Sequence, residues 1–294
     1  MNKTNIQFDD LSCSLKIKSN YPTLGRSSLK IANYILASHD KILNKPISEV
    51  AKEIGTSESS IIRFCREIGY SGFSELKLML AKEIGENNGS ILSKIKREST
   101  NNVNELEDLP VYVMEQTIQC LNDSLKILNI NEYKKAVMLI HEAENVYFYG
   151  VANSSSVAFD AVNKFIRIGI KCNLFLDTHM QMTTAINLTP KDVVIGISHS
   201  GMTRDTANVL NIAKKSGAKI ISITNYKGSI ISEIGDIKLL TANYETDFYS
   251  ETMVSRISQL AIIDMLYVGV IMMNRDKYMH SINRVNEEMA NLTY

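Results

Sequence analysis

The sequence contains little cysteine, and its cysteines form no metal-binding pattern. Four cysteines are spread over 294 residues without a CxxC pair, and the five histidines do not cluster with them. Structural zinc sites need closely spaced Cys and His ligands, so we expect no metal, and we predict no other cofactor. Cys65, Cys120 and Cys172 lie in apolar-periodic stretches, which is typical of small buried thiols.

The sequence also lacks the hydrophobic patterns that are typical of a signal peptide and of a membrane-spanning segment. The first ten residues, MNKTNIQFDD, contain no apolar core of the kind that a signal peptide needs. The longest apolar run, from Leu260 to Met273, is interrupted by Asp264 and is shorter than the roughly 18 residues that favour a membrane span. We therefore expect a soluble, cytoplasmic protein with no membrane partner.

An excess of charge of either sign is absent, since 32 basic residues balance 32 acidic ones. This balance excludes a simple polybasic protein. The charge is nevertheless uneven, because residues 11–97 contain about fourteen Lys and Arg against about eight Asp and Glu. A basic N-terminal part is consistent with a nucleic-acid contact.

The length and periodicity predict two domains. Residues 21–85 contain several short helix-like stretches with one apolar face. Residues 86–110 are polar and rich in asparagine or glycine at both ends, which is typical of a linker. We predict an all-α domain over 11–85, a linker over 86–110 and a second domain over 111–294.

The second domain alternates short apolar strands with helix-like stretches. The predicted strands are 145–150, 170–176, 192–198, 218–224 and 236–240, and the helices between them are 154–168, 179–187, 202–216 and 229–235. This alternation predicts an α/β domain with a five-stranded parallel sheet flanked by helices. Two further helices are expected over about 251–290. Their many Ile, Leu and Met residues predict that they pack on the sheet and also form a dimer interface, and core packing alone is the alternative.

The segment SEVAKEIGTSESSIIRFCREIGY reads as two short helices joined by a tight turn. Ser48 is predicted to cap the first helix, Gly55 ends it, and Thr56 or Ser57 caps the second. Such a pair is typical of a helix-turn-helix, whose second helix enters the major groove of DNA. A helical hairpin with exposed arginines is the alternative. The predicted DNA-contacting residues are Thr56, Ser57, Glu58, Ser59, Ser60, Arg63 and Arg66.

The segment IGISHSGMTRDTANVL places hydroxyls between a strand and a helix. Ser198, Ser200 and Thr203 follow a buried strand, where open α/β sheets bind ligands, and the next helix offers free N–H groups to an anion. Gly201 allows close backbone approach. This donor set favours a phosphate monoester over a carboxylate. Thr206, one turn further, is expected on the helix surface.

A second hydroxyl cluster, GVANSSSVA over 150–158, follows the first strand of the sheet. Two such turns at neighbouring strand ends would clasp one phosphorylated ligand. Simple helix capping by Ser and Thr is the alternative. Neither turn is a Walker loop or a dinucleotide fingerprint, because the required lysine and glycines are missing.

Both halves of the chain resemble known families. The segments GVANSSSVA and ISHSGMT resemble the two phosphosugar-binding segments of sugar isomerase (SIS) domains. ISEVAKEIGTSESSIIRFCREIGYSGFSELKLML resembles the helix-turn-helix domain of the RpiR family of bacterial transcription regulators, which joins these domains in this order. The resemblance implies a DNA-binding regulator, dimeric or tetrameric, whose SIS domain senses a sugar phosphate and modulates operator binding.

The resemblance also implies the roles of single residues. The phosphate binders would be Ser154, Ser155, Ser198, Ser200 and Thr203, and the residues that shape the pocket would be Gly150, Asn153, His199 and Gly201. His199 departs from the family, where the position between the two serines is often Gln or another polar residue. His199 would recognise a sugar hydroxyl through a hydrogen bond, or it is a variable position without a role.

The alternative function is an SIS-type sugar-phosphate isomerase or lyase. Such chemistry needs a general base beside the sugar carbons, and Glu251 is the best candidate, with His179 and His199 as assistants. A metabolic isomerase has no evident use for a DNA-binding domain. We therefore predict no enzyme activity and assign Glu251 a hydrogen bond to a sugar hydroxyl.

Overall fold

The structure is a computed structural model that describes residues 12–38, 42–87, 106, 109–242 and 251–290. The chain forms two compact units, Met1–Lys126 and Ile127–Tyr294, and each is described by itself. The predicted linker, 86–110, lies mostly outside the described residues.

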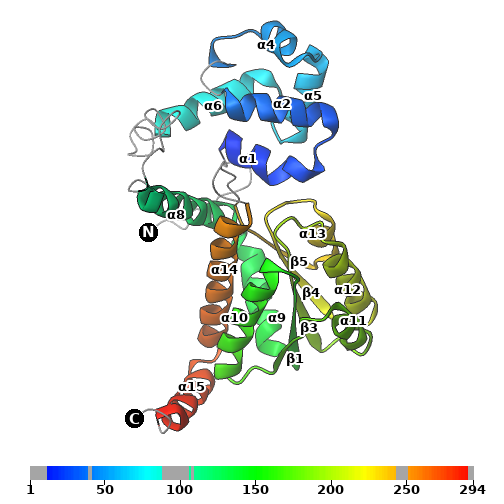
Figure 1. The fold of residues 1–294 in the computed structure, drawn as a ribbon, viewed down its shortest axis with the longest axis vertical. Coiled ribbons are helices and arrows are strands. Elements are labelled where there is room, and N and C mark those ends of the chain that lie inside the picture. Colours follow the sequence, from blue (N-terminus) through cyan, green and yellow to red (C-terminus); the bar gives the residue numbers. More distant parts are fainter. Residues whose placement is uncertain (1–11, 39–41, 88–105, 107–108, 243–250, 291–294) are drawn as a thin grey trace. The chain divides into compact units, whose positions relative to one another are not determined.

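The first unit is entirely helical where the structure describes it (Figure 1). Its core gathers Ile31 and Ile35 from one helix with Ile61 and Phe64 from another, and all four are almost completely buried. This agrees with the predicted all-α domain. The elements are α1 (Cys13–Asn20), η2 (Tyr21–Thr23), α2 (Arg26–Ala37), α4 (Ile47–Ile54), α5 (Glu58–Glu67), α6 (Phe73–Asn87) and α8 (Leu109–Ile127).

The start of α4 differs from the prediction that Ser48 caps it. The N-cap is Pro46, which makes no side-chain cap, and Ser48 is the second residue inside the helix. Proline has no N–H to lose at a helix start and its fixed φ suits the entry of the chain. The other two predictions hold: Gly55 ends α4 at a φ of 71°, and the Ser57 hydroxyl caps α5 by accepting the N–H of Ser60 at 3.2 Å.

The second unit is built on five parallel strands in the order β2-β1-β3-β4-β5. All five strands coincide with the predicted apolar runs, and the fully buried β3 shows why those runs have no polar alternation. The prediction of a five-stranded parallel sheet is confirmed. The strands are β1 (Asn145–Tyr149), β2 (Cys172–Leu174), β3 (Asp192–Ile197), β4 (Lys219–Thr224) and β5 (Ile237–Leu240).

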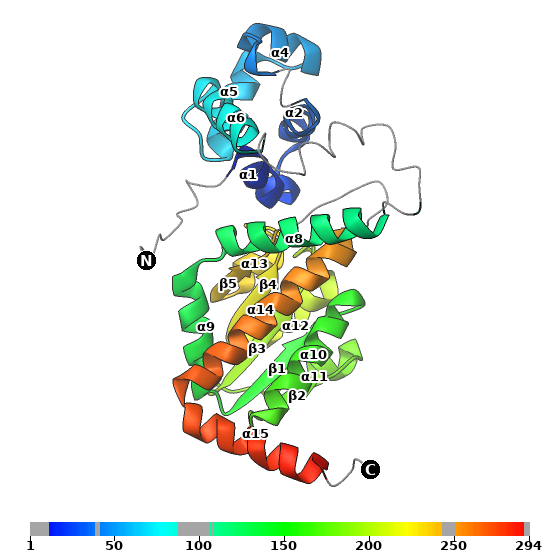
Figure 2. The same cartoon turned by 90° about the vertical axis from the view of Figure 1, so that its left-hand side faces the viewer.

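Helices cover both faces of this sheet (Figure 2). One face shares a core with α9 (Ile130–Glu142), α10 (Asn153–Arg167) and α14 (Glu251–Met273). The other face is covered by α11 (Thr178–Ile186), α12 (Arg204–Lys215) and α13 (Ile230–Ile234). A last helix, α15 (Arg275–Ala290), follows α14 after a break at Asn274.

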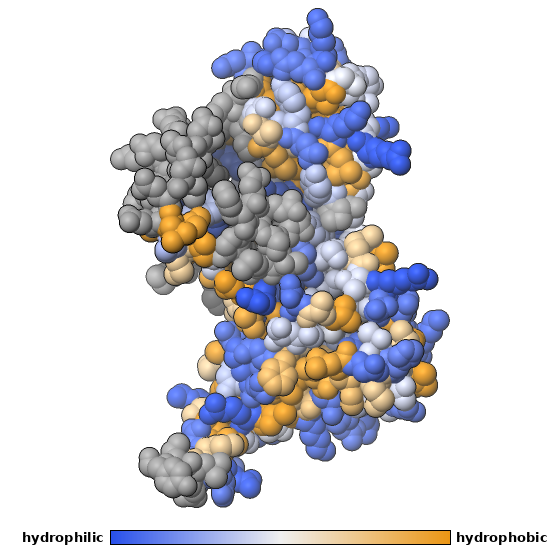
Figure 3. Space-filling view, viewed as in Figure 1, coloured by the Kyte–Doolittle hydropathy of each residue, from blue (hydrophilic) through white to orange (hydrophobic). Residues whose placement is uncertain are grey.

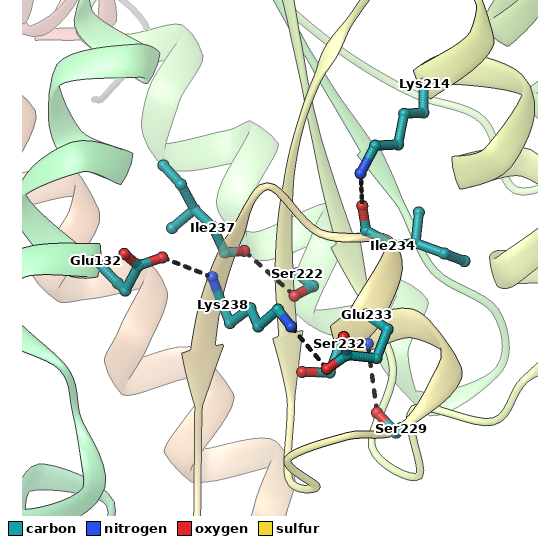
Figure 4. Close-up of polar contacts among 9 residues, drawn as sticks. All are labelled: Glu132, Lys214, Ser222, Ser229, Ser232, Glu233, Ile234, Ile237 and Lys238. Atoms are coloured by element: carbon teal, nitrogen blue, oxygen red, sulfur yellow. Dashed lines mark hydrogen bonds and ion pairs between the residues drawn. The ribbon is translucent and has the colours of Figure 1, made fainter.

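The edge strand β5 is held by polar contacts from two sides (Figure 4). Glu132 of α9 accepts the backbone N–H of Lys238, and the Lys238 ammonium pairs with Glu233 of α13 at 2.7 Å. Ser222 of β4 donates to the Ile237 carbonyl from inside the sheet. Edge strands carry unpaired backbone groups, so these contacts fix β5 and, with it, the position of α13.

The long helix α14 packs mainly against α9 and α10. By length and composition its segment Ser255–Met273 is apolar enough to span a membrane. However, Ile262, Ile263 and Leu266 are buried in the shared core, and Asp264 forms an ion pair with Lys164 of α10. These are the contacts of a core helix. Hydrophobic side chains also lie on the outside of this unit (Figure 3). The exposed hydrophobic residues of α10 and α14 include Phe159, Ile166, Val268 and Met272.

The buried carboxylate of Asp192 ties the start of β3 to β1. It accepts from Asn145 Nδ2 at 2.8 Å and from the Thr189 N–H and hydroxyl at 2.8 and 2.9 Å. Burial alone would raise the pKa of Asp192, but these hydrogen bonds together with the charge of Lys191 hold it below its usual value. The carboxylate is therefore stabilised in the folded protein.

We expect Asp192→Asn to lower the free energy of unfolding by about 1–3 kcal/mol at pH 7, the range for a hydrogen bond to a charged group. Because the folded pKa is lowered, the carboxylate contributes stability above its unfolded pKa of about 4, and that stability is lost as the pH falls through the folded pKa. Urea unfolding at pH 7 and pH 3 should therefore show a smaller difference between wild type and variant at pH 3. Glu144→Gln, which alters an exposed ion pair, is the control. A difference that does not change with pH would contradict this role.

Candidate functional site

The two hydroxyl-rich turns lie side by side at the carboxyl end of the sheet. β1 and β3 are neighbouring parallel strands, with Tyr149 paired to Gly196. Gly150, which follows β1, lies against the next strand so closely that a Cβ there would be 3.2 Å from the Ile197 carbonyl oxygen. The first turn (150–155) and the second turn (198–203) therefore form adjoining parts of one surface.

The first turn leads into α10 through a strained residue. Ala152 has a φ of 50°, the only positive φ at a non-glycine residue among the described residues, and it stands at the N-cap without a side-chain hydrogen bond. The Ser155 hydroxyl donates to the Ala152 carbonyl at 2.6 Å. No hydrogen bond of the half-buried Ser154 hydroxyl is found within the described ranges. Strain of this kind is concentrated at ligand sites, and Ser154 is left able to meet a ligand.

The second turn is built around the buried hydroxyl of Ser198. This side chain is 1% exposed; its Oγ accepts the N–H of Gly201 at 3.1 Å and lies 3.0 Å from the Thr203 hydroxyl. The hydroxyl of the half-buried Ser200 accepts the N–H of Met202 at 3.2 Å, and no other hydrogen bond of this hydroxyl is found among the described residues. Ser198 thus shapes the turn from inside, while Ser200 and Thr203 stand nearer the solvent.

Buried residues at the end of β4 and at the start of α13 support the second turn. The Gly201 carbonyl accepts the N–H of Ile231, and the His199 carbonyl accepts from Asn225 N–H and the Thr224 hydroxyl. Gly201 has a φ of 63°, and a Cβ there would lie 2.0 Å from Ser229 Oγ. The Ser229 hydroxyl in turn caps α13 through Ser232 (Figure 4). Only glycine fits at this position.

Helix capping does not account for the hydroxyls of either turn. Thr203 is the N-cap of α12, but it makes no side-chain cap, and Ala152 makes none for α10. The hydroxyls instead form contacts within their turns or remain open to a ligand. The positive ends of the α10 and α12 dipoles thus stay available to an anion.

The expectation for Thr206 is wrong, and the one for Glu251 is not tested. Thr206 is completely buried rather than on the helix surface, because it lies on the stripe formed with Leu210 and Ala213 at spacings of four and three residues. Glu251 begins α14, but its side chain lies outside the described part of the chain. Its predicted contact with a sugar hydroxyl stays a prediction.

Sequence reasoning missed Gln181 of α11, which lies against the first turn. It is 1% exposed, and its Nε2 donates to the Phe175 carbonyl at 2.6 Å and to the Gly150 carbonyl at 3.4 Å. His199 stands between the two serines, half-buried, with its ring edge against Tyr226. The exposed His179 lies in the first turn of α11.

The helix-turn-helix presents the predicted residues on one side of α5. Glu58, Ser59, Arg63 and Arg66 are exposed, and Ser60 is half-buried, while Ile61, Phe64 and Cys65 hold the helix in the core. Thr56 and Ser57 form the turn before it. The geometry of a helix that can enter the major groove is therefore present.

Groups of His, Cys, Asp and Glu that could hold a metal ion are not found among the residues that the structure describes. Cys13, Cys65, Cys120 and Cys172 are free thiols, and the first three are buried. Burial raises the pKa of Cys65 to about 12, so this thiol is protonated at neutral pH and unreactive.

Comparison with known proteins identifies both domains. The helix-turn-helix domain of the rpiR family matches residues 12–87, and the SIS domain matches residues 139–269. An uncharacterized HTH-type transcriptional regulator of Caldanaerobacter subterraneus is 36% identical over 90% of this chain and 92% of its own length. The HTH-type transcriptional regulator HexR of Escherichia coli is 30% identical over 93% of both chains.

The solved structure of the Vibrio vulnificus NanR protein complexed with ManNAc-6P has the same fold. It covers 96% of this chain and 99% of its own, with a TM-score of 0.60 and 23% identity. The two domain matches and the relatives that align over nearly the full chain lead to one assignment: the chain belongs to the rpiR family of helix-turn-helix transcriptional regulators with an SIS domain.

Proposed function

We propose that this regulator binds a phosphorylated sugar across the first and second turns and that the bound sugar changes its affinity for operator DNA. The observation that carries the proposal is the adjoining pair of hydroxyl-rich turns, whose hydroxyls do not cap their helices, in a chain that also contains a helix-turn-helix.

The chemistry of the two turns suits a phosphate monoester. Ser154, Ser200 and Thr203 offer hydroxyl donors from two directions, and charge-assisted hydrogen bonds of this kind are stronger than neutral ones. Ser155 would join them by releasing its hydrogen bond to the Ala152 carbonyl. Ser198 and Gly201 hold the second turn in shape, while Gly150, Asn153 and His199 would border the bound sugar. The NanR complex with ManNAc-6P supports the same ligand class for this chain.

A sensor is favoured over an isomerase or lyase by the relatives. Curated relatives that match over at least 90% of this chain are named transcriptional regulators, and a regulator needs binding energy rather than a placed general base. Purified protein should therefore not turn over hexose phosphates. Turnover that is lost in Glu251→Gln would favour the enzyme instead.

The regulator is proposed to work in the cytoplasm as a homodimer or homotetramer. The exposed Phe159 and Ile166 of α10 and Val268 and Met272 of α14 support an interface on this side of the SIS domain. A two-fold dimer presents two recognition helices to a pseudo-palindromic operator.

The ligand is found by a thermal-shift screen of the full chain against phosphosugars and their unphosphorylated parents. A ligand at about 100 times its Kd stabilises the folded state by about 2.7 kcal/mol, so a hit raises the Tm by several degrees. We expect hits only among phosphorylated sugars. Stabilisation by the parent sugars alone, or by none of the panel, would contradict the proposal.

A further inference from the structure

The helix-turn-helix unit contains a pocket whose lining includes two of the predicted DNA-contacting residues, Arg63 and Arg66. It has a volume of about 530 Å³, is open to solvent, and is lined by Gly25, Ser28, Arg63, Arg66 and Glu67. It lies where α5 packs against the start of α2. The pocket therefore borders the recognition helix rather than forming part of its exposed tip.

Two guanidinium groups give this pocket its chemistry. Arg63 and Arg66 are one turn apart on α5, both are exposed, and no ion pair of either is found among the described residues. Arginine forks match the geometry of phosphate oxygens and can bind them in pairs. Two arginines without a carboxylate partner, converging on one pocket, favour an anionic ligand.

Glu67, the acidic residue that lines the pocket, is hydrogen-bonded to Ser28 rather than paired with an arginine. Glu67 Oε2 accepts the hydroxyl of the buried Ser28 at 2.7 Å, which ties α5 to α2. The side chains lining the pocket then have two positive charges and one negative charge. Gly25, the N-cap of α2, lines the pocket without a side chain that would block the approach of an anion.

We infer that this pocket binds one phosphate of the DNA backbone, held by Arg63 and Arg66 together. The inference rests on the proposed DNA-binding function, and it assigns different DNA contacts to different residues of α5. The arginines fix the position of the helix on the duplex without reading its sequence, and the reading of base edges falls to Glu58 and Ser59 at the start of the helix. Contacts to phosphate position a protein, and contacts to base edges specify its site.

The test compares two duplexes bound by the full chain. One is enriched by selection from a random-sequence library, and the other has the same length and composition in scrambled order. Fluorescence anisotropy gives the Kd of each from 50 to 200 mM salt for wild type, Arg63→Ala, Arg66→Ala, Arg66→Lys and the double alanine variant. Lys30→Ala, which removes an exposed charge of α2 outside the pocket, is the matched control. Thermal unfolding confirms that each variant folds.

A phosphate contact predicts equal losses on both duplexes. The magnitude of the slope of log K against log salt should be smaller by about one in the double variant than in the wild type. The difference in affinity between the two proteins should therefore shrink by about threefold between 50 and 200 mM salt. Glu67→Gln should tighten binding to both duplexes, and Arg66→Lys should recover part of the affinity.

Three results would overturn the inference. The first is a loss of affinity confined to the enriched duplex, which would mean that the arginines contact bases, and the second is a loss of affinity no larger than that of Lys30→Ala. The third is thermal stabilisation of the protein by inorganic phosphate that requires Arg66, while DNA binding does not require it. Wild-type protein that binds neither duplex would instead contradict the proposed function.

Discussion

Gly201→Ala should lower the free energy of unfolding by about 3 kcal/mol and abolish phosphosugar binding. The added Cβ would meet Ser229 Oγ at 2.0 Å, Ser229 Cβ at 2.5 Å and Thr224 Oγ1 at 2.7 Å. All three atoms belong to buried residues, so the turn must move. Overpacking of this kind costs about 1–3 kcal/mol, and the left-handed backbone adds about 1–2 kcal/mol for a residue with a Cβ. Urea unfolding measures the first effect, and calorimetric titration with the sugar found by the thermal-shift screen measures the second.

Gly169→Ala is the matched control for this prediction. It has the same left-handed backbone, with a φ of 79°, but its added Cβ would meet only the Ser281 side chain, with the hydroxyl oxygen at 3.1 Å. This variant should lose about 1–2 kcal/mol and keep its ligand affinity. Equal stability and equal binding in the two variants would show that the close contact with Ser229 has no consequence.

Ser200→Ala should weaken phosphosugar binding by about 1–3 kcal/mol, or about 5- to 150-fold, with little effect on folding. The Ser200 hydroxyl accepts one local N–H and is half-buried, so its removal should change the free energy of unfolding of the free protein only a little. In the complex it would donate to a charged phosphate oxygen, which makes the bond worth more.

The titration compares this variant with Ser156→Ala, which changes an exposed serine of the NSSS run (153–156) after β1 that lies outside the predicted set. Ser156→Ala should bind as wild type does. An unchanged Kd in Ser200→Ala would remove this hydroxyl from the phosphate site.

The strands and most helices were predictable because their signals are local. A fully buried parallel strand must be apolar throughout, as β3 is, and the helix stripes follow a period of 3.6 residues. Where local rules compete, the sequence was ambiguous. Ser48 is a good cap by type, but Pro46 already sets the start of α4. Thr206 could have been placed correctly, because its spacing to Leu210 and Ala213 marks the buried stripe.

The support of the site was not predictable, because it depends on residues brought together by the sheet. Gly201 and Ser229 are in close contact across 28 positions of sequence, and Gln181 reaches Gly150 across 31. No periodicity or spacing connects such pairs. Thr224 and Asn225 could have been suspected, since β4 ends at Thr224 beside the end of β3 and Asn225 follows directly.

The coupling between the two domains is tested most directly by one binding measurement. Anisotropy of the enriched duplex with the full chain is recorded with and without each member of the phosphosugar panel. Regulatory coupling typically changes affinity by about 5- to 150-fold and is reciprocal. We predict that the phosphosugar that stabilises the protein changes the duplex Kd by at least about fivefold, and that Ser200→Ala needs a higher sugar concentration for the same change. A duplex Kd that stays constant across the whole panel would contradict a phosphosugar-responsive regulator.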